Sequence, residues 1–433
     1  MTAARFDVVI LGGGIAGLAA AGQLAKRGDS VLVLEGATRL GGMHKSVDIG
    51  PYTFDIGSIF YEPSAKIFEL ATGLEDQCPT TRRIQRRLLP DGSIRHYPID
   101  PGDVVRWPLG TLVRAMASML LGRMKGARGE TLEDICLARL GRVFFEETGL
   151  RNYTVHFNGV PPALIGREFY DSRMRFVHQA TSFHRIARAG WRALTRRKMN
   201  KTPRPPLHIR PVEGYDALFE RISKQLVAQG VTIRTGCTLE RISGTAGAMT
   251  VQAGGAEFTA ETVVGAMPLN SLHQALFDAP AEVQSLDLLS LFVSAEWLHP
   301  NSGNVFFNFH SEGGWKRATV YSRLYPGTGE GREYFTVEVT VPPGQKADKQ
   351  AAFEAFAAHA EKMGFARGVK LEGGHLAQAA YPVYSAGQMA MVPDILARIT
   401  QAGVIPVGRQ GRFEYLPTAS GVIRRVREVL DGL

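Results

Sequence analysis

The first residues of the chain carry an apolar pattern that predicts a strand, a helix and a second strand. The run "FDVVIL" at residues 6–11 is typical of a buried strand. The segment "LAAAGQLAKRG" that follows has the composition of a helix, and "SVLVLE" is a second strand that ends at Glu35. Two buried strands joined by a helix indicate an α/β fold with parallel strands.

Three glycines join the first strand to the helix and predict a nucleotide site. Gly12 permits a tight turn, Gly14 lets the backbone approach a pyrophosphate, and Gly17 lets helix and strand pack closely. The helix N-terminus offers free N–H groups to phosphates. Glu35, eighteen residues beyond Gly17, is placed to accept hydrogen bonds from ribose hydroxyls and would repel a 2′-phosphate. From this unit alone, FAD and NAD both remain open.

Further along the chain the pattern alternates and predicts strands. "NVFFNFH" and "YFTVEVTV" read as strands of a second sheet, and a hairpin is expected around "LPDGSIRHY". Between them, "WKRATVYSRLY" places Arg317, Tyr321 and Arg323 at alternating positions of one strand. Near the end, "VIPVG" predicts a strand, Gly408 its turn, and "TASGVIRRVREVL" a helix capped by Thr418 or Ser420. At 433 residues, two or three subdomains are expected.

The charge is concentrated in one segment. Residues 172–212 hold eleven of the fifty basic residues and no acid, which leaves 39 bases against 41 acids elsewhere, so this segment carries the net charge of +9. A second stretch, 104–128, has five bases and no acid among many apolar residues. Such segments bind anionic membrane surfaces or form ordinary helices whose apolar face is core. A nucleic-acid partner is not expected, because no recognised binding module accompanies the charge.

The remaining composition is that of a soluble globular protein, with 45% apolar and 21% charged residues. No apolar run reaches the length of about 20 residues that a membrane span needs. The three cysteines lack metal-ligand spacing and read as reduced thiols, so a cytoplasmic location is expected, with peripheral attachment to the inner face of the membrane as the alternative. His44 and His375 are lone histidines and receive no role.

A second glycine turn makes a family resemblance specific. "EGATRLGGMHKS" continues Glu35 with Arg39, Gly41 and Gly42, and "GPYTFDIGSIFY" (50–61) follows. The pattern resembles the FAD-containing amine oxidase superfamily, which includes protoporphyrinogen oxidase, phytoene desaturase-type enzymes and UDP-galactopyranose mutase. The tail "GRQGRFEYLP" (408–417) and "AYPVYSAG" (380–387) are most similar to the mutase-like branch. The resemblance implies FAD as the cofactor.

The resemblance also implies a fold: α/β, with a Rossmann-type FAD-binding domain of the glutathione-reductase kind, a mixed-sheet substrate domain and a helical insertion. The expected FAD-binding domain is discontinuous and takes 1–65, 208–270 and 390–433. The expected substrate-binding domain takes 66–100 and 271–389, and a basic helical subdomain takes 101–207.

The site residues that the resemblance implies fall into two groups. The cofactor-binding residues are Gly12, Gly14, Ile15, Ala16, Gly17, Glu35, Gly36, Arg39, Gly41, Gly42, Asp55, Gly57, Ser58, Gly408, Arg409 and Tyr415. The catalytic candidates are Arg317, Tyr384 and Tyr415. The N-terminus of the last helix would face the pyrimidine edge of the flavin, where negative charge develops on reduction.

The reaction is less readable than the cofactor. The arginine-tyrosine-phenylalanine stretch of a true mutase is absent before "RPVEGY", as is its histidine-rich segment. The first hypothesis is an FAD-dependent oxidoreductase in which flavin N5 accepts a hydride from a small, anionic or lipid-linked metabolite. The alternatives are a non-redox, mutase-like sugar isomerase that keeps its flavin reduced, and a flavin-binding scaffold that acts through the basic segment. The oligomeric state is left open.

Overall fold

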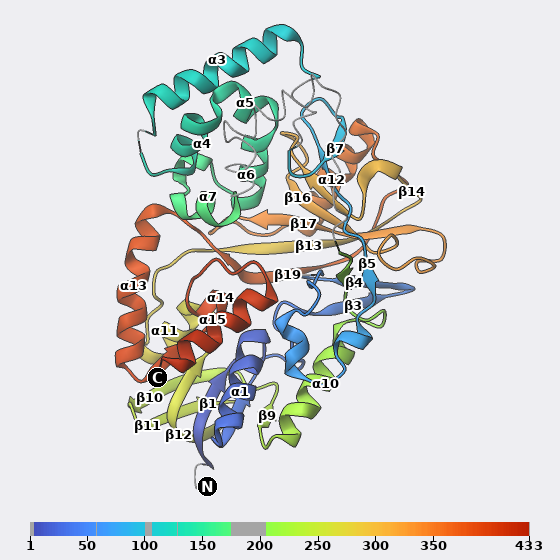
Figure 1. The fold of residues 1–433 in the computed structure, drawn as a ribbon. Helices are drawn as coiled ribbons and strands as arrows, with labels where there is room; N and C mark the ends of the chain where they lie inside the picture. Colours follow the sequence, from blue (N-terminus) through green and yellow to red (C-terminus); the bar gives the residue numbers. More distant parts are fainter. Residues whose placement is uncertain (1–3, 58, 100–105, 128, 175–204, 433) are drawn as a thin grey trace.

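Two seven-stranded sheets and a helical layer make up the protein (Figure 1). The structure is a computed structural model that describes all residues except 1–3, 58, 100–105, 128, 175–204 and 433. The first sheet and its helices lie at one end of the molecule, the helices α3 to α7 at the other, and the second sheet between them. None of the described helices is long and apolar enough to cross a membrane.

The first sheet confirms the predicted strand–helix–strand unit. β1 (Ala4–Leu11), α1 (Ile15–Arg27) and β2 (Val31–Leu34) follow one another, and β1 and β2 pair in parallel. The strand order is β10-β11-β12-β1-β2-β9, with β20 paired to β12. The other strands are β9 (Thr232–Arg234), β10 (Leu239–Thr245), β11 (Ala248–Ala253), β12 (Ala256–Gly265) and β20 (Val404–Pro406).

Both faces of this sheet are buried, which explains the continuous apolar runs in its strands. Val8 and Ile10 point to a core shared with α1, α10 (Tyr215–Ala228) and α15 (Ala419–Asp431). Val9 and Leu11 point to the opposite core, which α11 (Leu269–Phe277) and α13 (Ala386–Gln401) cover. The carboxyl ends of β1 and β2 are thereby held rigidly, and these ends carry Gly12 and Glu35.

The second sheet is mixed, in the order β19-β13-β17-β16-β15-β6-β7, with β15 and β6 parallel and the other pairs antiparallel. The expected hairpin is confirmed as β6 and β7. α12 (Lys349–Met363) covers one face, where Trp315 is fully buried. The strands are β6 (Gln85–Leu88), β7 (Ile94–His96), β13 (Ser285–Ala295), β15 (Val305–Asn308), β16 (Trp315–Val320), β17 (Glu333–Val341) and β19 (Lys370–Pro382).

A layer of helices packs on the other side of β15. It shares a core with the sheet through Phe307 and Phe309. Its helices are α3 (Leu109–Lys125), α4 (Leu132–Leu140), α5 (Arg142–Glu147), α6 (Leu150–Asn158) and α7 (Arg167–Arg173). The smaller elements are β3 (Ser46–Ile49), β4 (Tyr52–Asp55), β5 (Thr80–Thr81), β8 (Leu207–His208), β14 (Trp297–Leu298), β18 (Ala366–Arg367), α14 (Gly408–Gly411) and the 3-10 turns Lys66–Leu70, Glu75–Gln77, Pro162–Leu164 and Pro300–Ser302. The exact domain boundaries stay a prediction.

One predicted strand is shorter than its sequence pattern indicates. β16 ends at Val320, so Tyr321 and Arg323 lie in the following turn. Both side chains are held in this turn by polar partners from other segments. Tyr321 is buried and donates its hydroxyl to the Asp55 carbonyl at 3.1 Å, while Arg323 pairs with Glu333 at 2.9 Å. Arg323 therefore neither lines the cavity described below nor stands free in solvent.

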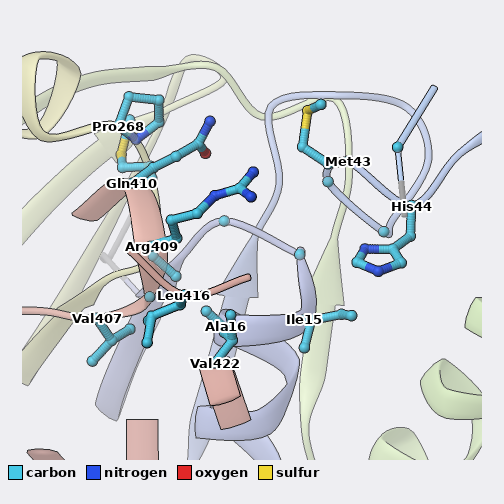
Figure 2. Close-up of a pocket in the computed structure, with 18 of the residues that line it drawn as sticks. Ile15, Ala16, Met43, His44, Pro268, Val407, Arg409, Gln410, Leu416 and Val422 are labelled. Atoms are coloured by element: carbon cyan, nitrogen blue, oxygen red, sulfur yellow. The ribbon is translucent and has the colours of Figure 1, made fainter. Parts of the chain in front are cut away.

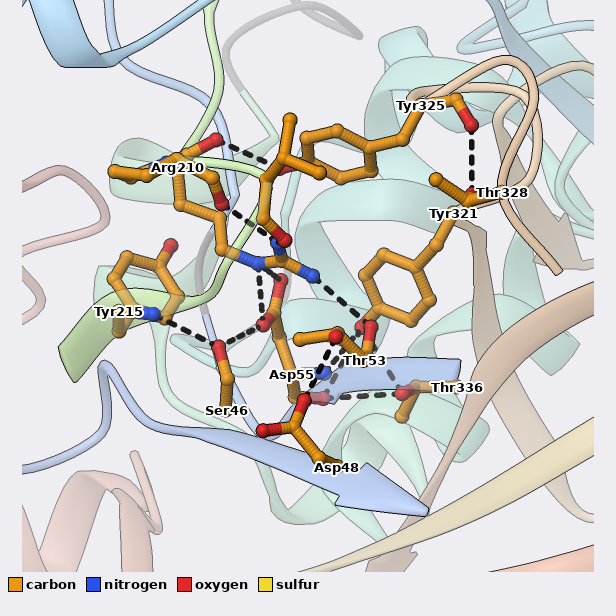
Figure 3. Close-up of polar contacts among 12 residues, drawn as sticks. Ser46, Asp48, Thr53, Asp55, Arg210, Tyr215, Tyr321, Tyr325, Thr328 and Thr336 are labelled. Carbon is orange, nitrogen blue, oxygen red and sulfur yellow. Dashed lines mark hydrogen bonds and ion pairs between the residues drawn. The ribbon is translucent and has the colours of Figure 1, made fainter. Parts of the chain in front are cut away.

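A buried ion pair joins the end of β4 to the segment before α10, next to β17 of the mixed sheet (Figure 3). Arg210 Nε lies 2.8 Å from Asp55 Oδ1, and neither side chain has any solvent-exposed surface. Three further hydrogen bonds run from the guanidinium to the carbonyls of Thr53, Pro211 and Val212, and its carbon lies 4.6 Å from the centre of the Tyr325 ring. Burial lowers the pKa of Arg210, but the neighbouring carboxylate outweighs this and raises it.

The first prediction concerns the stability that this pair provides. Arg210→Met leaves the Asp55 carboxylate buried without its cation, so the free energy of unfolding is expected to fall by about 3–5 kcal/mol. Arg39→Met is the control, because Arg39 pairs with Asp216 at 2.7 Å on the surface and exposed pairs contribute at most about 1 kcal/mol. Urea unfolding measures both variants. Equal losses in the two variants would contradict the assignment.

Candidate active site

A cavity of roughly 600 Å³ lies between the first sheet and the second. The ends of β1 and β2, the turn after β12 and the C-terminal segment supply most of its wall. The second glycine turn, the loop between β9 and β10, α6 and the strands β16, β17 and β19 supply further residues. Arg409 and Gln410 project from the segment after β20 into the space between Pro268 and Met43 (Figure 2). The cavity therefore runs from the nucleotide sheet to the face of the mixed sheet.

The glycine turn after β1 is shaped to hold a phosphate group. A side chain at Gly12 would approach the Ala266 carbonyl to 2.6 Å, and one at Gly17 would approach the Gly12 carbonyl to 1.9 Å, so both positions need glycine for close packing. Gly14, the N-cap of α1, makes no side-chain cap, and the first turn of the helix carries no acid. The N–H groups in the first turn of α1 are thus left for an anion at the cavity wall.

Glu35 stands at the end of β2 with its carboxylate fixed by backbone. Its two oxygens accept hydrogen bonds from the N–H groups of Gly13 at 2.6 Å and Ala37 at 2.9 Å. Each carboxylate oxygen keeps a second acceptor site, which suits ribose hydroxyls. Thr238 and Cys237 line the same end of the cavity. The residues present therefore fit a dinucleotide cofactor, with phosphates at α1 and a ribose at Glu35.

The tail of the chain closes the cavity from the opposite side. Gly408 has φ +77°, and a side chain there would come within 2.6 Å of the Ala16 methyl group. Thr418 caps α15 by accepting a hydrogen bond from the Gly421 N–H at 3.0 Å, as the sequence predicts. Thr418, Ala419 and Val422 line the cavity. The positive end of α15 therefore lies at the cavity wall.

The structure brings most of the predicted cofactor residues to the wall. They are Gly12, Gly14, Ile15, Ala16, Glu35, Gly36, Gly41, Gly42, Gly57, Gly408, Arg409 and Tyr415. Among the catalytic candidates, Arg317 and Tyr415 also line it. Ser58 lies outside the described residues.

Four predicted residues lie away from the wall, each for a physical reason. Gly17 serves the packing of α1 on β1, and Arg39 instead binds Asp216 in the first turn of α10. Asp55 is enclosed in the buried ion pair with Arg210. Tyr384 is buried in the core of the helical layer, where its ring lies edge-on to Tyr415 at 5.8 Å.

The end of the cavity at the mixed sheet is rich in cations. Arg317 binds Glu338 with Nε at 3.1 Å, and Lys316 Nζ lies 3.2 Å from the other oxygen of the same carboxylate. The ring of Tyr381 lies between two cations, with Lys316 Nζ at 4.5 Å and the guanidinium carbon of Arg409 at 4.7 Å from its centre. Three cations therefore meet one carboxylate around Tyr381.

These charges shift the titration of the groups they surround. Burial raises the pKa of Tyr381, but Lys316, Arg409 and Arg317 outweigh burial and Glu338, so the pKa falls below its usual value. Burial likewise raises the pKa of Glu338, and Arg317 and Lys316 outweigh it, which keeps the carboxylate ionised. Burial and Arg409 lower the pKa of His44 to about 4, so this cavity histidine is neutral at pH 7.

Sequence reasoning missed much of this end of the cavity. Glu338 is the charged residue inside the alternating run "YFTVEVTV", and Lys316 directly precedes the predicted Arg317, so both carried a signal. Tyr381 stands beside Tyr384 in "AYPVYSAG", but the role was assigned to Tyr384. His44 gave no signal, because its place in the wall depends on how the second glycine turn packs against α10.

Comparison with known proteins points to one family. The sequence profile of the flavin containing amine oxidoreductases matches residues 15–370. A protein named as a flavin-containing monoamine oxidase from Mycobacterium tuberculosis is 31% identical over 159 residues, which is 34% of each chain. One so named from Dictyostelium discoideum is 48% identical over 52 residues, 12% of this chain and 11% of that protein. These sequence matches span about a third or less of the relatives' length.

Solved structures share the whole fold at low identity. A reduced UDP-galactopyranose mutase superposes with a TM-score of 0.81 at 17% identity, covering 100% of this chain and 95% of that one. A protein described as a protoporphyrinogen oxidase from Exiguobacterium superposes with a TM-score of 0.72 at 17% identity, covering 100% and 99%. The profile covers most of the chain and the cavity fits a dinucleotide. The chain thus belongs to the family of flavin-containing amine oxidoreductases, and its cofactor is FAD.

Proposed function

We propose that the protein is an FAD-dependent oxidoreductase that oxidises a small organic anion. The observation that carries this proposal is the charge at the mixed-sheet end of the cavity. Arg317 and Lys316 pair there with Glu338, and Arg409 lies over the ring of Tyr381, so three cations stand against one carboxylate. A cation such as an unsubstituted alkylamine would be repelled there, whereas a carboxylate or phosphate would be attracted. The substrate class therefore differs from that in the names of the monoamine oxidase relatives.

Different cavity residues would carry different parts of such a reaction. When FAD is bound, it supplies a ring that accepts a hydride from an activated C–H bond. Arg317 and Arg409 would orient the anionic group of the substrate, and the close wall would keep water out. Tyr381 has a lowered pKa because it lies among these cations, which favour its phenolate form. That phenolate oxygen would take the proton that the substrate releases as the hydride departs.

A second candidate is a non-redox rearrangement of a nucleotide sugar on the reduced flavin. The same arginines would suit a diphosphate, and the tail of this chain is similar to that of the mutase-like branch. Under this candidate Arg317 would bind substrate phosphate. The likeness to the mutase structure is one of fold, so activity assays must separate the two candidates.

The prediction for the reaction is a dependence on substrate charge. Without oxygen, organic acids with an oxidisable C–H bond, such as hydroxy acids and amino dicarboxylates, are expected to bleach the visible flavin band, and matched alkylamines are not. Bleaching by alkylamines alone would contradict the proposal. If no compound of either set reduces the flavin but the reduced protein interconverts nucleotide sugars, the second candidate is correct.

Arg317→Gln provides the matched test of the residue. Removal of one charged hydrogen bond costs about 1.5–3 kcal/mol, so the Kd of an anionic ligand should rise roughly ten- to a hundredfold. Arg323→Gln is the control, because Arg323 also pairs with a glutamate in this sheet region but lies outside the cavity. The Kd of the anionic ligand for each variant is obtained from the change in the flavin spectrum during titration. An equal rise in both variants would point to general destabilisation instead.

The prediction for Tyr381 is an early step in the tyrosine titration. Because the cations lower its pKa, its phenolate band should appear below the usual pKa of about 10. Tyr61, Tyr215, Tyr321 and Tyr325 have raised pKa values through burial and cannot supply this step. Tyr381→Phe should abolish the step in an ultraviolet pH titration, and Tyr384→Phe should retain it. Persistence of the step in Tyr381→Phe would refute the assignment.

A further inference from the structure

Helix α3 exposes a continuous apolar stripe to solvent. Six of the thirteen large hydrophobic side chains that are exposed among the described residues belong to this one helix. They are Leu109, Val113, Met116, Leu120, Leu121 and Met124, with exposed fractions from 51% to 84%. Their spacing of three and four residues places them on one face. The sequence left open whether this apolar face is core, and the structure shows these six side chains outside it.

The opposite face of α3 is the one that packs. Ala115 is buried, and a side chain at Gly122 would approach the Leu137 carbonyl of α4 to 2.3 Å. A side chain at Gly141, the N-cap of α5, would come equally close to the backbone of Ser118. The helix is therefore already anchored through small residues on its inner side. Its outer stripe is not needed to hold it in the fold.

The charges on α3 and in the segment just before it have one sign. Arg114 and Lys125 fall on the same flank, roughly a third of a turn from the centre of the stripe, and both are exposed. Exposed Arg106 precedes the helix, and residues 104–128 contain no acid. An apolar stripe flanked by cations matches a bilayer surface, with acyl chains for the stripe and anionic headgroups for the cations. A second copy of the same face would instead bring like charges together.

We infer that α3 docks the protein on the surface of an anionic phospholipid bilayer, with the helix axis in the plane of the membrane. α3 lies at the end of the molecule farthest from the nucleotide sheet (Figure 1). It contacts α4 and α5, α5 contacts α6, and Phe157 of α6 lines the cavity. The docking face is therefore connected to the mixed-sheet end of the cavity by a short stack of helices. The inference does not depend on the reaction proposed above.

Vesicle flotation of the full-length, FAD-loaded protein tests this docking. We expect binding to vesicles of phosphatidylcholine mixed with phosphatidylserine, weaker binding to phosphatidylcholine alone, and a decrease as salt is raised. The double variant Met116→Glu/Leu120→Glu places two carboxylates in the stripe and should weaken binding roughly tenfold or more. Val227→Glu is the matched control, since Val227 is 56% exposed on α10 and should leave binding unchanged.

Three results would overturn the inference. The wild-type protein could fail to float with anionic vesicles, or the double variant could float as well as the wild type, which would assign binding to the basic segment 172–212 instead. The third is a change of oligomeric state in the double variant without any lipid binding, which would identify the stripe as a contact between copies. Circular dichroism and the flavin spectrum of each variant establish that it is folded, so that a loss of binding refers to the surface.

Discussion

The buried pair of Arg210 and Asp55 fixes how the two halves of the cavity meet. Asp55 ends β4, Arg210 precedes α10 of the nucleotide half, and Tyr321 of the mixed-sheet half bonds the backbone of Asp55. Two charges removed from water are tolerated only because each has several hydrogen-bond partners. Any arrangement that separates the pair would leave a buried charge without its counter-ion. The pair therefore favours a single arrangement of these segments. The relative position of these segments in turn sets the shape of the cavity between the sheets.

The two ends of the cavity carry different charged groups. At the nucleotide end, a helix N-terminus and a carboxylate held by backbone N–H groups present complementary surfaces to phosphates and a ribose. At the other end, three cations outnumber one carboxylate and lower the pKa of Tyr381. The charges at this second end come from side chains, whereas backbone N–H groups contribute at the nucleotide end. Under the proposed function, these few side chains select the substrate on a fold that the chain shares with an oxidase and a mutase.

The nucleotide half could be predicted from the sequence because its chemistry is local. Gly12, Gly14 and Glu35 lie within one strand–helix–strand unit, where spacing along the chain determines position in space. In the second half, Arg317 and Tyr415 were predicted but Glu338 and Tyr381 were not, because they reach the cavity only through strand pairing between segments far apart in the sequence. The position of Asp55 away from the cavity wall could not be predicted for a similar reason. Its partner, Arg210, lies 155 residues away, and no local pattern announces an enclosed pair.

The visible spectrum of the purified protein, recorded before and after mixing with FAD, tests the central claim most directly. The account predicts a yellow protein, or one that becomes yellow, with one FAD retained per chain after gel filtration. Gly14→Leu, which fills the space beside the helix N-terminus, should lose that cofactor while keeping its secondary structure. A wild-type protein that is folded and retains no flavin after incubation with FAD would contradict the account.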